Sequence, residues 1–321
     1  MTRERQGDKP GYMNNMPTLL LAAISLSLAA CGQSADPAPA TEAEVDAAQA
    51  QADGSGGAGA ARELIFSDEF SGDRLDPTRW NTVGMDFWVN EEEQAYVNSP
   101  DTIQFVQDLE GADGGALVLR PVYRPGEDTN EERNADFISG RVNTRGTFEF
   151  TYGRAEARIR MPDAVGVWPA FWLLADAEWP SEGEIDIMEY VGQADWTGVA
   201  LHGAGYSGDA GIADRQYFSE GTDVTDWHVY AAEWTPEGVE FFVDDRLTFR
   251  VPKTNVEFFG DWVFDNPQYV VLNFAVGGIY PYKINGIEQP YKGMPQSTAD
   301  RIEAGELAME VDWVRVYGAE D

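Results

Sequence analysis

Three carboxylates stand close together in an apolar run at residues 183–192, GEIDIMEYVG. The residues between Glu184, Asp186 and Glu189 favour a β-strand. Side chains alternate along a strand, so Glu184 and Asp186 share a face, and a one-residue bulge at 187–188 would bring Glu189 to it. Crowded like charges raise the proton affinity of at least one member. A carboxylic acid beside a carboxylate is the pair that cleaves glycosidic bonds, although an isolated motif of this kind also suits an acidic edge strand.

The composition excludes several other chemistries. One cysteine, Cys31, permits no internal disulfide, and with only two histidines, His202 and His228, a zinc site of His and Cys ligands is nearly excluded. No GxSxG motif supports a serine nucleophile, and GSGGAG at 54–59 lacks the flanking strand and helix of a nucleotide site. The 22 basic and 56 acidic residues give a net charge of −34, which disfavours nucleic acid and anionic membranes but not a neutral polysaccharide.

The carboxylates must be positioned by strands, because short apolar runs recur throughout residues 63–321. The segment 154–161 alternates between apolar and charged residues, and 239–251 reads as a hairpin that turns at Asp244–Asp245. Only Ser297–Leu307 carries helix signals. Strands without intervening helices predict an all-β fold, a β-sandwich of the jelly-roll type. The expected strands are Leu64–Phe66, Ala116–Leu119, Thr147–Phe150, Ala155–Met161, Val229–Trp234, Val239–Val243, Tyr269–Val276 and Met309–Tyr317.

The first 62 residues read as a sorting signal and a tether. Residues 1–30 combine basic residues with an apolar run too short to span a bilayer comfortably, and they end in small residues before Cys31. This resembles a bacterial lipobox, which implies cleavage before Cys31 and its lipidation; an ordinary secretory signal is the alternative. Residues 31–62 have the composition of a disordered linker, and 63–321 form one catalytic domain. We expect an exported monomer whose lipid alone attaches it to the outer membrane or cell surface.

Further motifs stand on either side of the acids. They are SDEF (67–70), SGR (139–141), YGRAEARIRMP (152–162), GVWPAFWLL (166–174), WHVYAAEW (227–234), LNFAVGG (272–278) and VDWVRVYG (311–318). Together with the acids they resemble glycoside hydrolase family 16, in its laminarinase (endo-β-1,3-glucanase) branch. The form E-I-D-I-M-E, with its extra methionine, is similar to the bulged members of that family. The resemblance implies a concanavalin A-like jelly roll with an open substrate cleft.

By this resemblance Glu184 is the nucleophile, Glu189 the acid/base, and Asp186 the helper that orients the nucleophile. It implies retaining endo-hydrolysis of β-1,3-glucosidic bonds in a neutral β-glucan such as laminarin, without a catalytic cofactor. Mixed-linkage β-1,3-1,4-glucanase, agarase-type hydrolysis and transglycosylation are alternatives in the same family. A binding protein without turnover is a further one, which the presence of all three acids disfavours.

The resemblance also assigns residues around the acids, against the alternatives of core packing or ordinary surface polarity. Some members hold a structural calcium ion between the first and last strands, where Glu69 and Asp312 match; a buried hydrogen-bonding role is the alternative. The long segment 278–309 departs from the family pattern, and its tyrosines could extend the cleft or block it. His228 is expected to be structural. The expected substrate-binding residues are Trp168, Trp172, Trp179, His202, Asn90 and Arg141.

Overall fold

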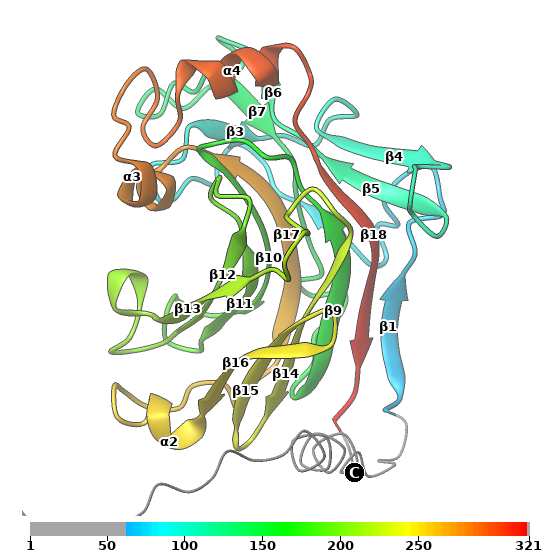
Figure 1. The fold of residues 1–321 in the computed structure, drawn as a ribbon, viewed down its shortest axis with the longest axis vertical. Coiled ribbons are helices and arrows are strands. Elements are labelled where there is room, and N and C mark those ends of the chain that lie inside the picture. The colour runs from blue at the N-terminus through cyan, green and yellow to red at the C-terminus, as the bar shows by residue number, and fades with distance from the viewer. Residues whose placement is uncertain (1–61, 320–321) are drawn as a thin grey trace, which may run out of the picture. The chain divides into compact units, whose positions relative to one another are not determined.

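A computed structural model of the protein describes residues 62–319, which form β-sheets and a few short helices (Figure 1). The predicted leader, Cys31 and nearly all of the predicted linker lie outside the described residues. No helix in the described part is long and apolar enough to cross a bilayer. The strands are β1 (Leu64–Asp68), β2 (Asn81–Thr82), β3 (Gln94–Tyr96), β4 (Ile103–Gln107), β5 (Gly115–Leu119), β6 (Val122–Tyr123), β7 (Phe137–Ser139), β8 (Arg141–Asn143), β9 (Gly153–Arg160), β10 (Val167–Ala175), β11 (Glu184–Glu189), β12 (Trp196–His202), β13 (Ile212–Tyr217), β14 (His228–Thr235), β15 (Gly238–Val243), β16 (Arg246–Pro252), β17 (Gln268–Val276) and β18 (Met309–Tyr317). The helices are η1 (Gly208–Ala210), α2 (Lys253–Val256), α3 (Ile279–Asn285) and α4 (Gln296–Glu303).

Two large sheets form the sandwich. The first has the strand order β16-β15-β14-β9-β18-β5-β4, with β1 also paired to β18. The second has the order β13-β12-β11-β10-β17-β8-β2, and a small sheet β3-β7-β6 accompanies them. In Figure 1 the sheet that contains β10 and β17 lies to the left of the sheet that contains β9 and β18. The predicted all-β sandwich is confirmed.

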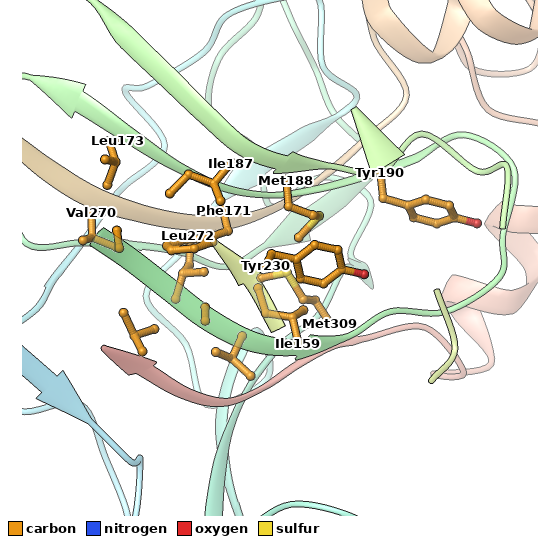
Figure 2. Packing of buried hydrophobic residues seen from close by; sticks show 14 of the residues in the cluster. Ile159, Phe171, Leu173, Ile187, Met188, Tyr190, Tyr230, Val270, Leu272 and Met309 are labelled. Atoms are coloured by element: carbon orange, nitrogen blue, oxygen red, sulfur yellow. The ribbon is translucent and has the colours of Figure 1, made fainter. Parts of the chain in front are cut away.

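A continuous apolar core fills the space between these two sheets. Ile159 of β9, Phe171 of β10 and Leu272 of β17 all belong to this core (Figure 2), and all three are fully buried. The alternation predicted for 154–161 is confirmed, because Ala155 and Ala157 are buried in the same core. Each sheet therefore has one face committed to the core, and the outer face of the second sheet is free to carry polar side chains.

The hairpin prediction is also confirmed. Strands β15 and β16 pair through Val243 and Arg246, and the two residues between them, Asp244 and Asp245, both adopt positive φ. Two positive φ values in succession are typical of the type I′ turn that favours strand pairing.

Two expectations about local structure need correction. Residues 147–150 are not a strand; they form a turn and a loop with a single bridge from Phe150 to Gln268. The predicted helix at 297–307 is shorter and begins one residue earlier, as α4. Helix α3, which the sequence did not predict, carries a buried Pro281 in its first turn and ends at Asn285, before Gly286 with its positive φ.

Candidate active site

Strand β11 carries the three acids and contains the predicted bulge. Asp186 pairs with Ala200 of β12, and Glu189 pairs with Gly198. Between these two pairs β11 therefore contains one residue more than β12. The extra residue lets Ile187 and Met188, although consecutive, both enter the core, where each is fully buried (Figure 2). A bulge re-aims the residues that follow it. Glu189 is thereby turned outward to the face that carries the other two acids.

Glu184 and Glu189 line one cavity of about 290 Å³ on the outer face of the second sheet. Asp186 lies on the strand between them and is only 4% exposed. Four of the predicted binding residues line this cavity, and the loop and helix after β12 and β17 complete it. The further lining residues are Asn90, Trp168, Trp179, Val199, Ala200, His202, Gly208, Asp209, Ala213, Ile279, Tyr280 and Lys283.

Each glutamate accepts a hydrogen bond from its own indole. Trp168 Nε1 donates to Glu189 Oε1 at 2.8 Å, and Trp179 Nε1 donates to Glu184 Oε2 at 3.0 Å. Trp168 points outward because Val167 and Phe171 of the same strand are committed to the core. Hydrogen bonds to a carboxylate stabilise its charged form, so the indoles hold both acids in place and limit their proton affinity.

Burial raises the pKa of all three acids. The pKa of Glu184 lies well above its usual range through burial and the neighbouring Asp186 carboxylate, opposed by His202 and the Trp179 N–H. Burial and the charge of Glu189 raise the pKa of Asp186 well above its usual range. Burial also raises the pKa of Glu189, and the hydrogen bond from Trp168 opposes this. A cluster of this kind holds a proton more readily than isolated carboxylates do, and a general acid needs such a proton.

His202 lies beside the acids at the end of β12. Its register partner is Glu184, and its Nε2 lies 3.2 Å from Asp186 Oδ2 and 3.9 Å from Glu184 Oε1. Trp179 covers the ring at a centroid distance of 6.2 Å. A Cβ on Gly211 would lie 2.5 Å from His202 Cε1, so only glycine fits there without displacing the imidazole.

One wall of the cavity comes from the segment whose role the sequence left open. Tyr280 of α3 packs edge-on against Trp168 at 5.5 Å, and burial followed by the charge of Glu189 raises its pKa. Lys283, one turn further along α3, forms an ion pair with Asp209 of η1, which belongs to the opposite wall. Tyr280 is one of the tyrosines of 278–309 expected to extend or block the cleft, whereas no local sequence signal predicts Lys283 or Asp209.

Trp172 and Arg141, predicted to bind substrate, lie beside the cavity rather than in its lining. Trp172 pairs with Asp186 across β10 and β11, and its indole N–H donates to Asn273 Oδ1 at 2.7 Å. Arg141 is 5% exposed, and its guanidinium lies 4.8 Å from the Trp172 ring centroid. These contacts extend through Asn273 Nδ2 to the Tyr96 hydroxyl, so a buried polar network lies beside the cavity, on the face of the sheet that carries the acids.

The residues matched to a calcium site make other contacts. Both carboxylate oxygens of Glu69 accept hydrogen bonds from Arg315. Asp312 is buried and pairs with Arg158, and it also accepts the backbone N–H of Asp113. Carboxylates engaged by arginines in separate pairs are a poor donor set for calcium, which takes six or more oxygen ligands. The calcium site stays a prediction that these contacts do not favour.

His228 lies outside the cavity. Its Nδ1 is 2.7 Å from Asp244 Oδ2 and its Nε2 is 3.0 Å from the carbonyl oxygen of Asp223. Both partners are acceptors, so the protonated ring, which donates from both nitrogens, satisfies both contacts. Burial lowers the pKa of His228, but the hydrogen bond and charge of Asp244, the Asp223 carbonyl and the charge of Asp226 together raise the pKa overall. The predicted structural role agrees with these contacts.

Comparison with known proteins places this geometry in a family. Residues 87–284, more than half of the chain, match Glycosyl hydrolases family 16. A beta-glucanase of Rhodothermus marinus is 37% identical over 270 residues, which cover 79% of this chain and 85% of that protein.

Solved structures agree with the sequence relatives. The laminarinase catalytic domain of Thermotoga maritima matches with 32% identity and a TM-score of 0.68, over 81% of this chain and 99% of that one. The laminarinase of Rhodothermus marinus matches with 34% identity and a TM-score of 0.64, over 80% and 97%. The chain therefore belongs to glycosyl hydrolase family 16.

Proposed function

We propose that the protein is an endo-β-1,3-glucanase that hydrolyses laminarin-type β-glucans with retention of configuration. The observation that carries this proposal is the bulge in β11, which directs Glu184 and Glu189 into one cavity while Asp186 lies between them. Double displacement needs two carboxylic side chains that face the same sugar, one as the nucleophile and the other as the acid/base. The relatives named beta-glucanase and laminarinase support a β-glucan as the substrate.

In the first step, protonated Glu189 gives its proton to the glycosidic oxygen while a Glu184 oxygen bonds to the anomeric carbon. The carbon–oxygen bond to the leaving sugar breaks, and a glycosyl ester on Glu184 remains. In the second step, Glu189 takes a proton from water, the water oxygen bonds to the anomeric carbon, and Glu184 leaves as a carboxylate. Two inversions give net retention.

The cavity lining suits a neutral sugar chain. Trp168, Trp179 and Tyr280 offer aromatic surface to the apolar faces of sugar rings, and Asn90 and His202 offer polar groups. Asp186, buried next to the nucleophile, orients Glu184 and tunes its proton affinity through their shared charge. Catalysis in this scheme uses side chains alone.

Substrate choice is tested by release of reducing ends from laminarin, lichenan and agarose under identical conditions. We expect the highest rate on laminarin, with internal cleavage visible as a rapid fall in chain length. Strong agarose cleavage without activity on laminarin would refute the substrate assignment. Products longer than the starting oligosaccharide would instead indicate transglycosylation.

The roles of the two glutamates are tested by chemical rescue. Glu184→Ala should abolish hydrolysis, and azide should then restore turnover of an activated glycoside with an inverted glycosyl azide as product. Glu189→Ala should instead give the azide product of retained configuration, because the nucleophile is intact. An inverted product from Glu189→Ala would exchange the two assignments.

We also propose that the protein is exported as a monomer and anchored by lipid on Cys31. The small residues before Cys31 and the basic, apolar stretch upstream support this. Labelled fatty acid should enter the wild-type protein but not Cys31→Ser, which should be released from the membrane fraction. Equal labelling of both proteins would exclude this anchor.

A further inference from the structure

The floor of the cleft brings three different metal-ligand side chains together. Donor atoms of Glu184, Asp186 and His202 all lie within 4.8 Å of one another. Within residues 62–319, this is the one group of three such residues with that spacing. The shortage of histidine and cysteine argues against a zinc site built from those two residues alone, but not against one that combines a single imidazole with two carboxylates.

The interatomic distances fit a small tetrahedral ion. Zinc–ligand bonds of about 2.0–2.2 Å place the ligand atoms of a tetrahedral site roughly 3.3–3.6 Å apart. His202 Nε2 lies 3.2 Å from Asp186 Oδ2 and 3.9 Å from Glu184 Oε1, on either side of that range. Two of the three separations are therefore close to those of a tetrahedral site, and the third, between Glu184 and Asp186, is at most 4.8 Å.

One of these potential metal-ligand atoms, Asp186 Oδ2, is a buried oxygen that accepts no hydrogen bond from the described residues. Asp186 is 4% exposed, and its Oδ2 has no hydrogen-bond partner among the described residues. His202 Nε2 is close to it, but the contact lacks hydrogen-bond geometry, and His202 Nδ1 is likewise unpartnered within 62–319. A buried acceptor left unsatisfied is unfavourable and rare, and a bound cation would satisfy it.

We propose that Glu184, Asp186 and His202 form a binding site for a divalent transition-metal ion, represented by Zn²⁺, and that the bound ion inhibits the enzyme. One imidazole and two carboxylates suit Zn²⁺, whereas Ca²⁺ and Mg²⁺ need more oxygen ligands. The fourth position faces the cavity that Glu184 and His202 line, so water can complete the coordination. The net charge of −34 raises the local concentration of cations.

Occupation of this site and attack on a sugar exclude each other. A Glu184 oxygen that coordinates the ion has committed the electron pair it would donate to an anomeric carbon. The ion also occupies the part of the cavity where the sugar must approach. Inhibition should therefore be competitive with substrate, and removal of the ion by EDTA should restore the full rate.

The chain offers a residue-specific readout, because it contains only two histidines. Full-length protein with Cys31→Ser, which removes the single thiol, is labelled with ¹⁵N-histidine and titrated with ZnCl₂. We expect the His202 ring resonances to shift to saturation at one ion per chain, while those of His228 stay in place because both of its nitrogens are engaged. Shifts at His228 alone, or at neither ring, would overturn the proposal.

Calorimetry on the same protein provides the matched comparison. His202→Gln should weaken Zn²⁺ binding at least about ten-fold, since loss of even an outer partner of a metal site has an effect of that size. His228→Gln should leave the affinity for Zn²⁺ unchanged, and titration with MgCl₂ should show no binding. Equal binding by His202→Gln and wild type would contradict the assignment.

Binding and turnover are measured separately, so the two proposals can fail independently. If ¹⁵N shifts at His202 appear but laminarin is not cleaved, the metal site stands and the glucanase assignment falls. If laminarin is cleaved and Zn²⁺ does not raise the apparent KM, the metal proposal falls. The NMR titration needs no variant at the site, so misfolding of His202→Gln would not remove the test.

Discussion

The two indole–carboxylate hydrogen bonds make a paired prediction about the pH profile. Trp168→Phe keeps an aromatic ring beside Tyr280 but removes the N–H that donates to Glu189 at 2.8 Å. That hydrogen bond favours the charged carboxylate, so its loss adds to the effect of burial and raises the pKa of Glu189 further. Since the proposed mechanism requires a protonated Glu189 in the first step, the alkaline limb of kcat/KM should move to higher pH.

The size of this shift follows from the strength of the bond. A hydrogen bond to a charged group contributes about 1.5–3 kcal/mol. One pKa unit corresponds to about 1.4 kcal/mol, so the alkaline limb should move by roughly 1–2 units. Trp179 is 50% exposed, and water can replace its N–H at Glu184. Trp179→Phe should therefore raise the pKa of Glu184 only modestly, and the acidic limb of kcat/KM should move to higher pH by no more than about one unit.

The assay is the initial rate on laminarin at concentrations far below KM, measured across the pH range for wild type and both variants. The kcat/KM profile reports the essential groups of the free enzyme. An alkaline limb that stays in place in Trp168→Phe, or one that moves down, would refute the stated role of the indole. If Trp168→Phe moved the acidic limb instead, the nucleophile and acid/base would be exchanged.

Three further predictions concern the cleft wall, the buried network and the second histidine. Lys283→Ala breaks an exposed ion pair with Asp209 that joins the two walls, and it should change kcat/KM on laminarin by up to about five-fold with little effect on a short aryl glycoside. Asn273→Ala leaves the N–H of Trp172 unpartnered and should lower the free energy of unfolding by about 1–3 kcal/mol in urea titrations. The folded-state pKa of His228 is raised above 6.5, so its bond to Asp244 stabilises the fold below that pH and the gain disappears as pH rises through the folded pKa. His228→Gln should therefore lower Tm more under acidic than under alkaline conditions.

A control variant separates the effect of the cleft wall on activity from a general loss of stability. Glu306→Gln breaks an exposed ion pair with Arg301 away from the cavity and should leave the polymer rate unchanged. Equal behaviour of Glu306→Gln and Lys283→Ala would contradict the role of the wall. Unaltered urea stability of Asn273→Ala, or an equal Tm loss for His228→Gln at all pH values, would each contradict the contacts named above.

The local geometry of the catalytic strand was predictable because it depends on near neighbours. Alternation along 184–189 fixes which side chains share a face, and the parity conflict at Glu189 requires a bulge at Ile187–Met188. The hairpin at Asp244–Asp245 was predictable for the same reason, since two residues decide the turn. The layered all-β fold followed from short apolar runs without helical periodicity.

The far walls of the cleft were not predictable in this way. Lys283 and Asp209 meet only because α3 and η1 fold back over the same strands, and nothing in either local sequence signals the other. Arg141 belongs to the SGR motif, whose family resemblance suggests sugar binding, yet it is buried against the Trp172 ring. Residues 147–150 look like a strand locally but turn as a loop, because no neighbouring strand pairs along their length.

The connection between β17 and β18 has a consequence for how this scaffold diversifies. It leaves one sheet and returns to the other, and on the way α3 supplies Ile279, Tyr280 and Lys283 to the cleft. Both of its ends are held by central strands, but Met294, Ala299 and Ile302 of this connection are buried in the core, so a replacement must still fill that space. Exchange of the cleft-lining residues 279–283 between related enzymes, with the buried part of the connection kept, is therefore the direct route to altered polymer preference.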